Sequence, residues 1–233
     1  MTIIIPALNE AGTLNKVAVN LVEFLEKTDL DYEIIIIDDG STDGTGEIAD
    51  RLASQNPLIK TIHNGKNMGF GYAVKKGIDN ASKEWATIVT ADDEVEIEDI
   101  KLFLPYAEKS DIVVGYIKNK EIRTRMRRIL SWCFRTTVRI LFKINLPSIN
   151  GMPFYRVSKV RSLDIKSHDF SIQAEILVKG SKKGLRIGKF GYRIKPRLSG
   201  EPKATKFRHI WNSFKSTMKL WKEVGDESST FGQ

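Results

Sequence analysis

Cysteine is almost absent from this sequence, and long apolar runs do not occur in it. The single Cys133 excludes an internal disulfide and a metal site built from several cysteines. It also makes a reducing, intracellular compartment the default expectation. No stretch approaches the roughly 18 consecutive apolar residues of a membrane-spanning helix. Residues 2–5 are strand-like without a basic and apolar leader before them, so we expect no signal peptide.

The composition is that of a globular protein. The chain has 233 residues, of which 41% are hydrophobic, so it can bury a full core. It is too apolar for a disordered chain and too polar for a bundle of membrane helices. The length fits one large α/β domain, or one domain with a small appendage.

The net charge of +8 conceals a strong asymmetry between the two halves. Residues 1–116 carry 10 Lys and Arg against 21 Asp and Glu, whereas residues 117–233 carry 27 against 8. An uneven solvated surface is one explanation. The alternative is functional: an acidic half suits a metal ion and hydroxyl groups, and a basic half suits phosphates, anionic lipid or nucleic acid. Nucleic acid is disfavoured because no RNA- or DNA-binding motif appears.

The first half alternates strands and helices. Hydrophobic periodicity predicts strands at residues 3–6, 32–37, 58–63, 85–90 and 111–115, and helices at residues 15–27, 45–54, 69–81 and 99–109. Such alternation predicts an α/β fold with a mostly parallel, doubly wound sheet and helices on both faces. Ligands of these sheets bind beyond the carboxyl ends of the strands.

The second half contains two basic amphipathic helices, predicted at residues 123–144 and 206–224, with short segments between them. An apolar stripe of this kind is ordinarily a core face. However, Trp132 and Ile140 lie off the stripe of the first helix, and Trp211 and Trp221 accompany many lysines in the second. This mixture favours interfacial helices that lie on anionic lipid.

Two acidic clusters follow predicted strands. Asp92 and Glu94 project from one tight turn, and their hard oxygens suit Mg²⁺ or Mn²⁺ together with substrate phosphates. The alternative is an acidic start of a helix, favoured by the helix dipole. Asp38 and Asp39 need partners at a strand end, and a nucleotide base or ribose hydroxyl could supply them, whereas Asp43 is explained by capping alone.

Glycines and basic residues form two further motifs. Gly69 and Gly71 begin a dinucleotide-like pattern whose third position is Val74, so we interpret these glycines as permitting close packing at a helix start. Arg197 and Lys203 lie in a predicted loop that is rich in cations. Such a loop could close over a pyrophosphate, or it could be a solvated basic loop.

These motifs, in this order, resemble the family-2 nucleotide-diphospho-sugar glycosyltransferases with the GT-A fold. The matching stretches of the first half are residues 5–10, 37–45, 67–73 and 91–92. The second half is similar to the branch that contains dolichyl-phosphate mannose synthase and its bacterial polyprenyl relatives, at residues 114–119, 127–131, 174–180 and 197–203. The resemblance covers residues 3–222.

The resemblance implies roles for particular residues. Pro6, Glu10 and Asp39 contact the base and ribose of the donor, while Asp92 and Glu94 bind the metal ion. The remaining three implied residues hold the phosphates of donor or acceptor: Arg127, Arg197 and Lys203. Together with Asp92, these three cations form the implied catalytic set.

The sequence departs from the family pattern at several positions. The usual Asp-x-Asp-x-Gln becomes residues 90–94, where Thr90 replaces the first aspartate and Glu94 replaces the amide. Residues 148–153 replace the usual Asp-x-x-Ser-Gly-Phe, and Gln173 replaces an aspartate. These changes bear on the metal geometry and on the choice of sugar or acceptor.

The resemblance therefore implies an inverting, metal-dependent transferase on the cytoplasmic face of a membrane. It moves mannose or glucose, with GDP-mannose favoured as donor, onto a polyprenyl or dolichyl phosphate. Residues 1–116 form the nucleotide-sugar half, residues 117–224 the acceptor half with the membrane-surface helices, and residues 225–233 a flexible tail. The expected partners are the donor, the lipid acceptor, the membrane surface and a membrane protein, but no nucleic acid. The alternatives are a soluble sugar or protein acceptor, and an inactive membrane-associated relative.

Overall fold

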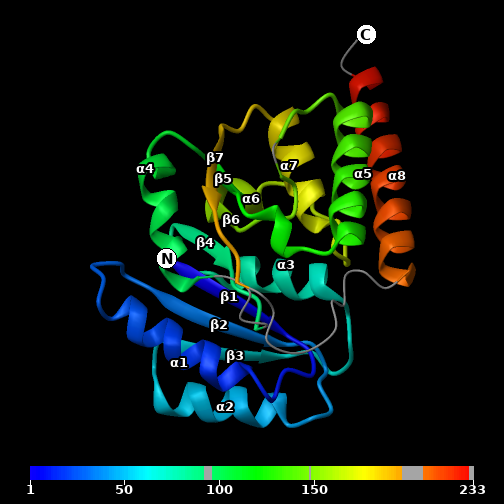
Figure 1. Ribbon diagram of the computed structural model, residues 1–233. Helices are drawn as coiled ribbons and strands as arrows, with labels where there is room; N and C mark the ends of the chain where they lie inside the picture. Colours follow the sequence, from blue (N-terminus) through cyan, green and yellow to red (C-terminus); the bar gives the residue numbers. More distant parts are fainter. Residues whose placement is uncertain (92–95, 147, 196–206, 231–233) are drawn as a thin grey trace.

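A computed structural model describes residues 1–91, 96–146, 148–195 and 207–230 of the chain. Its strands form a seven-stranded sheet in the order β3-β2-β1-β4-β6-β5-β7 (Figure 1). The strands are β1 (Thr2–Ala7), β2 (Glu33–Asp38), β3 (Ile59–His63), β4 (Trp85–Ile88), β5 (Ile112–Ile117), β6 (Pro153–Arg156) and β7 (Ile187–Tyr192). All neighbouring strands are parallel except β6, which runs antiparallel to β4 and β5. The mostly parallel sheet predicted from the sequence is confirmed.

The helices cover both faces of this sheet. They are α1 (Leu14–Leu25), α2 (Thr45–Gln55), α3 (Phe70–Asn80), α4 (Leu104–Ala107), α5 (Arg125–Phe142), α6 (Val157–Arg161), α7 (Ile172–Lys182) and α8 (Phe207–Thr230), with the 3₁₀ turns η1 (Ile97–Phe103) and η2 (Lys120–Ile122). In Figure 1, α1 and α2 lie on one side of the sheet, and α3 lies on the other.

The isoleucine-rich strands are buried on both faces. Ile34 and Ile36 of β2 belong to the core beneath α1 and α2, whereas Ile35 and Ile37 belong to the core beneath α3 and α7. Successive strand side chains point to opposite faces. The sequence of a parallel strand that helices cover on both faces is therefore a nearly continuous apolar run, as in β1 and β2.

The predicted fifth strand is not the neighbour of the fourth. β6 lies between β4 and β5 and pairs antiparallel with both, so two reversals leave β5 parallel to β4. The carboxyl end of β5 therefore lies at the same edge of the sheet as those of β1 to β4. β6 and β7 both come from the second half of the chain, and they complete the sheet that the first half begins.

The segment after β4 differs from the single helix predicted at residues 99–109. It consists of the 3₁₀ turn η1 followed by the short helix α4, which carries Pro105 near its start. Because proline has no N–H to donate to the preceding turn, it interrupts a regular α-helix and is tolerated at a helix start. α6 was not predicted separately.

α5 and α8 pack side by side at one end of the sheet (Figure 1). α8 is held to the rest of the core by Glu223, whose carboxylate accepts hydrogen bonds from Lys166 at 2.8 Å and Lys179 at 2.9 Å. α8 continues to Thr230, and so includes residues 225–230, which the sequence analysis assigned to the tail. Among the helices that the structure describes, none has the length and apolar character needed to cross a membrane.

Candidate donor and acceptor sites

The loops that follow β1 and β2 form one edge of the sheet. Gly40 in the second loop has φ +75°, and a Cβ on it would lie 2.5 Å from the backbone carbonyl carbon of Lys66. Glycine is required there because it alone adopts this conformation without strain and leaves room for the neighbouring chain. The Asp38-Asp39-Gly40-Ser41 turn therefore bends sharply away from the end of β2.

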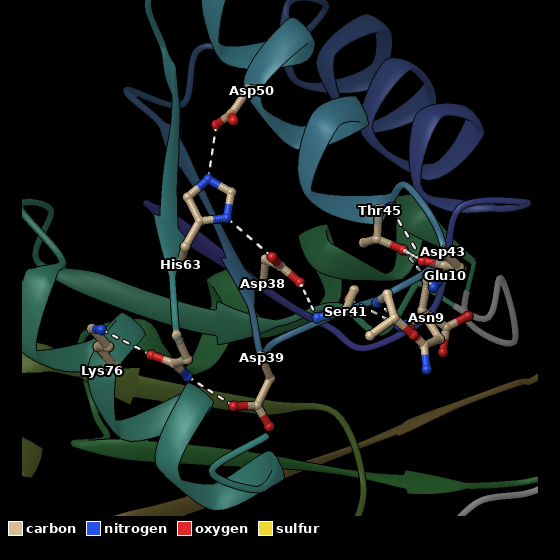
Figure 2. Close-up of polar contacts among 12 residues, drawn as sticks. Asn9, Glu10, Asp38, Asp39, Ser41, Asp43, Thr45, Asp50, His63 and Lys76 are labelled. Carbon is tan, nitrogen blue, oxygen red and sulfur yellow. Dashed lines mark hydrogen bonds and ion pairs between the residues drawn. The ribbon is translucent and has the colours of Figure 1, made fainter. Parts of the chain in front are cut away.

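Hydrogen bonds join these two loops to each other (Figure 2). Asn9 N–H donates to Ser41 Oγ at 3.0 Å, and Thr42 N–H donates back to Asn9 Oδ1 at 2.9 Å. Glu10 N–H donates to Thr45 Oγ1 at 2.8 Å. Polar side chains thus accept hydrogen bonds from backbone N–H groups that have no partner in a helix or strand. These hydrogen bonds hold the two loops together.

The residues predicted to contact the donor nucleotide come together at this edge. Pro6 lies near the end of β1, opposite Ile37 of β2, and Asp39 N–H donates to Ala7 O at 2.9 Å. Pro6 and Glu10 are half-buried, whereas Asp39 is 3% exposed. The three predicted residues therefore lie at the same edge of the sheet.

Asp39 is satisfied largely by the chain itself. Its Oδ1 accepts hydrogen bonds from Asn64 Nδ2 at 2.8 Å and Met68 N–H at 2.9 Å, and its Oδ2 accepts one from Gly69 N–H at 2.8 Å. Asp43 also serves the chain, since its Oδ1 accepts from Thr45 N–H and Thr45 Oγ1. Its Oδ2 also accepts from Ala11 N–H at 3.1 Å. Asp43 therefore bonds the first residue of α2 and also joins the two loops, which is more than the capping role predicted for it.

Asp38 also has protein partners. Its Oδ1 accepts from Ser41 N–H at 3.0 Å, and its Oδ2 lies 3.0 Å from His63 Nδ1. Burial raises the pKa of Asp38, but the hydrogen bonds from Ser41 and His63 outweigh it and hold that pKa below its usual value. His63 was not among the residues predicted for the site. The signal was available, because His63 ends the strand beside β2 and lies in register with Asp38.

The glycines at the start of α3 allow close packing, as predicted. A Cβ on Gly69 would lie 2.4 Å from His168 O, and one on Gly71 would lie 2.6 Å from Asp169 O. Gly71 N–H donates to His168 O at 2.9 Å. The motif therefore packs α3 against residues 168–169, which precede α7.

The predicted metal ligands and part of the phosphate-binding set, namely Asp92, Glu94, Arg197 and Lys203, lie outside the described residues. The residues that flank these two segments meet, because Lys195 Nζ lies 2.6 Å from Glu96 Oε2. Within the described ranges, no group of three or more His, Cys, Asp or Glu side chains could hold a metal ion.

A cavity of about 470 Å³ lies beside the carboxyl end of β5. Five cations line it: Lys120, Arg123, Arg125, Arg128 and Arg135. Ile129 and Trp132 line it as well, together with Ile117 at the end of β5. Acidic residues are absent from the described lining, so the cavity suits an anion that carries an apolar group.

Arg127 is not among the residues that line this cavity. It is half-buried near the start of α5, and its N–H donates to Thr124 Oγ1 at 3.3 Å, which caps the helix. The lining residues Arg125, Arg128, Trp132 and Arg135 recur at helical spacing and so share one face of α5. That periodicity could have identified the cavity from the sequence.

A family model described as glycosyl transferase family 2 matches residues 2–164. The chain is 29% identical over 231 residues to the dolichol-phosphate mannosyltransferase of Pyrococcus furiosus, covering 92% of this chain and 64% of that protein. It is 26% identical over 211 residues to the undecaprenyl-phosphate mannosyltransferase of Micrococcus luteus, covering 86% of this chain and 85% of that protein. It is 30% identical over 155 residues to a dolichyl-phosphate beta-glucosyltransferase of Trichomonas vaginalis, covering 60% and 46%. The chain therefore spans less than two thirds of the length of two of these relatives: 46% of the Trichomonas protein and 64% of the Pyrococcus protein.

Solved structures share the fold. Glucosyl-3-phosphoglycerate synthase from Mycobacterium tuberculosis superposes with a TM-score of 0.73 at 15% identity, covering 95% of this chain and 79% of that one. This likeness, together with the mostly parallel sheet and its helices, identifies the architecture as GT-A.

Proposed function

The chain belongs to glycosyl transferase family 2, and we propose that it moves one hexose from a nucleotide diphosphate sugar to a polyprenyl phosphate with inversion. Mannose or glucose is the proposed sugar, with GDP-mannose the favoured donor. Two of the relatives named above are polyprenyl-phosphate mannosyltransferases and one is a dolichyl-phosphate glucosyltransferase. The observation that carries the proposal is the cation-lined cavity beside β5.

The cavity fits the phosphate end of a lipid acceptor. Its five cations can hold a phosphate monoester, which is anionic at neutral pH, while Ile129 and Trp132 contact the first isoprene units. Arginine pairs with phosphate through two parallel hydrogen bonds, which also fixes the direction of the attacking oxygen. Three further cations are proposed to bind the phosphates of the donor or the acceptor: Arg127, Arg197 and Lys203.

The donor nucleotide is proposed to bind at the carboxyl ends of β1 and β2. Pro6, Glu10 and Asp39 then contact the base and ribose. Glu10 belongs to the loop that is hydrogen-bonded to the β2–α2 loop, so its backbone is fixed before the donor arrives. Preformed loops of this kind reduce the entropy lost on binding.

A divalent Mg²⁺ or Mn²⁺ ion fits the residues after β4. Ala91, the last described residue after β4, is buried. The sequence that follows it contains Asp92 and Glu94, whose side chains offer the hard oxygens that these ions prefer. When bound, such an ion neutralises charge on the donor's two phosphates. A crystal structure of the mycobacterial synthase contains Mn²⁺ with UDP-glucose.

The proposed chemistry is one in-line displacement. An oxygen of the acceptor phosphate forms a bond to the anomeric carbon, the bond from that carbon to the donor's β-phosphate oxygen breaks, and the nucleoside diphosphate leaves. The attacking oxygen is already ionised, so no general base is needed. The cations of the cavity hold two phosphate-bearing molecules together against their mutual repulsion and position them for reaction.

The site is proposed to work at the cytoplasmic surface of a membrane. Ile140 on α5 is 70% exposed, and Trp132 is 58% exposed beside Arg128 and Arg135. Apolar and basic side chains on one helix surface favour contact with anionic lipid. In this proposal residues 1–116 hold the donor, and residues 117–224 hold the acceptor and the membrane.

A soluble acceptor is the competing proposal. The structural neighbour was crystallised with phosphoglyceric acid, a small phosphorylated molecule that could use a similar cation-lined cavity. The exposed Trp132 and Ile140 favour the lipid acceptor, because a soluble acceptor does not need them.

Thr90, which replaces a family aspartate, motivates a third proposal of an inactive relative that binds donor without turnover.

The test is transfer from radiolabelled GDP-mannose or UDP-glucose to dolichyl phosphate in detergent, with Mg²⁺, Mn²⁺ or a chelator. We expect lipid-extractable label from one donor, and its loss with the chelator. Asp92→Ala should abolish metal-dependent transfer, whereas Asp79→Ala, on the exposed end of α3, should leave it unchanged. Normal transfer by Asp92→Ala would overturn the metal assignment.

A second variant tests the cavity. Arg128→Gln should raise the KM for the lipid acceptor about tenfold, because one charge-assisted hydrogen bond to phosphate is lost. Arg51→Gln, at an exposed position of α2 outside both the described lining and the two basic helices, is the control. An unchanged KM in Arg128→Gln, or transfer to a soluble phosphorylated acceptor alone, would contradict the lipid-phosphate proposal.

A further inference from the structure

Two consecutive residues at the end of β3 meet two consecutive aspartates at the end of β2. His63 is in register with Asp38, and the next residue, Asn64, donates its N–H to Asp38 O at 2.8 Å. Neighbouring side chains of an extended chain point to opposite faces. His63 accordingly lies between Asp38 and Asp50 of α2 (Figure 2). Asn64 contacts Asp39 and Lys76 of α3. Asp38 therefore has a side-chain partner at the end of β3, and Asp39 has one in the residue that follows β3.

His63 lies between two carboxylates. Its Nδ1 is 3.0 Å from Asp38 Oδ2, and its Nε2 is 2.9 Å from Asp50 Oδ1 on α2. An ionised carboxylate only accepts hydrogen bonds, so both contacts are satisfied together when both ring nitrogens carry protons. These hydrogen bonds raise the pKa of His63 above its usual value. Asp38 and Asp50 are the titratable groups that face the ring in the part of the chain that the structure describes.

Asn64 is fixed in one orientation. Lys76 Nζ donates to its Oδ1 at 2.8 Å, which turns the amide nitrogen toward Asp39 Oδ1, also at 2.8 Å. Asn64 is only 6% exposed, so water cannot readily replace either contact. Lys76, Asn64 and Asp39 therefore form a chain of hydrogen bonds from the surface to the turn.

The two aspartates in turn hold the backbone that forms the proposed donor site. Asp38 accepts the N–H of Ser41, whose Oγ accepts the N–H of Asn9 in the neighbouring loop. Asp39 accepts the N–H groups of Met68 and Gly69 at the entry of α3. An aspartate that turned away would release these loops.

We propose that His63 and Asn64 are positioning residues for the donor nucleotide: His63 fixes Asp38 and the β2–α2 turn, and Asn64 fixes Asp39 and the entry of α3. The inference rests on the proposed function, because it assigns the nucleoside diphosphate to this edge. Neither residue needs to touch the nucleotide. It also predicts that nucleotide binding weakens when His63 loses its proton.

The first measurement is made without ligand, so it does not depend on the proposed function. Amide hydrogen exchange of the whole chain should be faster at Ser41 in His63→Gln, and faster at Met68 and Gly69 in Asn64→Ala. Lys76→Met should reproduce the Asn64→Ala pattern more weakly and serves if Asn64→Ala fails to fold. Thr61→Val is the matched control, since Thr61 lies on the same strand and its buried hydroxyl has no hydrogen-bond partner within the described residues.

The second measurement is calorimetric titration of each variant with UDP and with GDP at fixed Mg²⁺. The nucleotide that binds should bind His63→Gln and Asn64→Ala about tenfold more weakly, and Thr61→Val as the wild type does. As pH rises above the ordinary histidine pKa of about 6.5, wild-type affinity should fall, and His63→Gln should lose this dependence.

The outcomes separate the two proposals. Unchanged exchange at Ser41, Met68 and Gly69 overturns the positioning role whatever the nucleotide does. Altered exchange with unchanged affinity, or with pH dependence retained in His63→Gln, also overturns it. If the wild type binds neither nucleotide, the donor assignment of the proposed function fails, and the residue-specific exchange pattern still decides whether His63 and Asn64 fix the two aspartates.

Discussion

Glu33 is a buried carboxylate at the start of β2, on the edge of the sheet opposite the proposed site. Its side chain accepts hydrogen bonds from Thr2 Oγ1 and Lys60 Nζ, both at 2.8 Å, and from Ser82 N–H. Burial alone would raise the pKa of Glu33, but these hydrogen bonds outweigh it and lower that pKa to about 2. Glu33 thereby connects the beginning of β2 to β1, to β3 and to the residues that precede β4.

Replacing Glu33 should cost stability in a pH-dependent way. Because the folded pKa is depressed, the ionised form stabilises the protein above the unfolded pKa of about 4.3, and this contribution is lost as pH falls toward about 2. Glu33→Gln should lower the free energy of unfolding near neutral pH by about 1–3 kcal/mol. It should also lose less stability than the wild type between about pH 5 and about pH 2.

Urea unfolding at several pH values measures both effects. Glu23→Gln, at an exposed position of α1, is the control and should behave as the wild type. A parallel loss of stability with falling pH in Glu33→Gln and wild type would contradict the assignment.

At the scale of elements, the entry of α3 depends on two glycines that lie against the chain before α7. Phe70 stacks on Phe170 across the same contact, with ring centroids 4.8 Å apart. The backbone approach is close enough that only glycine fits at position 71, where the chain has no positive φ to explain the choice. Packing against another segment therefore fixes this residue, whereas turn geometry does not.

Gly71→Ala should destabilise the protein by about 1–3 kcal/mol, because the new methyl group would meet the backbone of His168 and Asp169. Thermal unfolding monitored by circular dichroism measures the change. Gly12→Ala is the matched control, since nothing lies within 4 Å of the methyl group that it would add. Equal melting temperatures for the two variants would show that the contact yields without strain.

The elements also show where periodicity succeeds and fails. The alternation of strands and helices predicted a sheet with helices on both faces, and the structure confirms it: β1 and β2 are buried almost throughout. The predicted stripe of α5 is only partly buried: Val138 and Phe142 lie in the core, whereas Ile129 and Cys133 are exposed. Periodicity identifies the apolar face of a helix, but neighbouring elements decide how much of that face is covered.

At the scale of the whole molecule, α5 and α8 carry exposed apolar side chains among many cations. Met126 is 63% exposed and Ile129 56% on α5, and Trp221 is 43% exposed on α8. Exposed positions on the two helices also carry basic residues: Arg125, Arg128, Arg139, Lys215 and Lys222. This surface is the part of the molecule that the proposed function assigns to anionic lipid.

Flotation with vesicles that contain phosphatidylserine tests this surface. Trp132→Ser and Ile140→Ser should each weaken vesicle binding about tenfold, because a smaller apolar area is then transferred from water into the lipid interface. Binding should also weaken as salt is raised. Leu102→Ser is the control, since Leu102 on η1 is 40% exposed away from these helices. No flotation of the wild type would favour a soluble acceptor.

The sequence by itself determined the alternation of strands and helices, the presence of helices on both sheet faces, and the carboxyl edge at which Asp38 and Asp39 lie. These follow from local periodicity and from turn residues, which act over a few neighbouring positions. The insertion of β6 between β4 and β5 and the partners of the Asp39 carboxylate were decided only by the tertiary structure. They join residues 25 or more positions apart in sequence, as Asn64 and Asp39 are. Such pairings depend on how whole elements pack, and local sequence does not encode that packing directly.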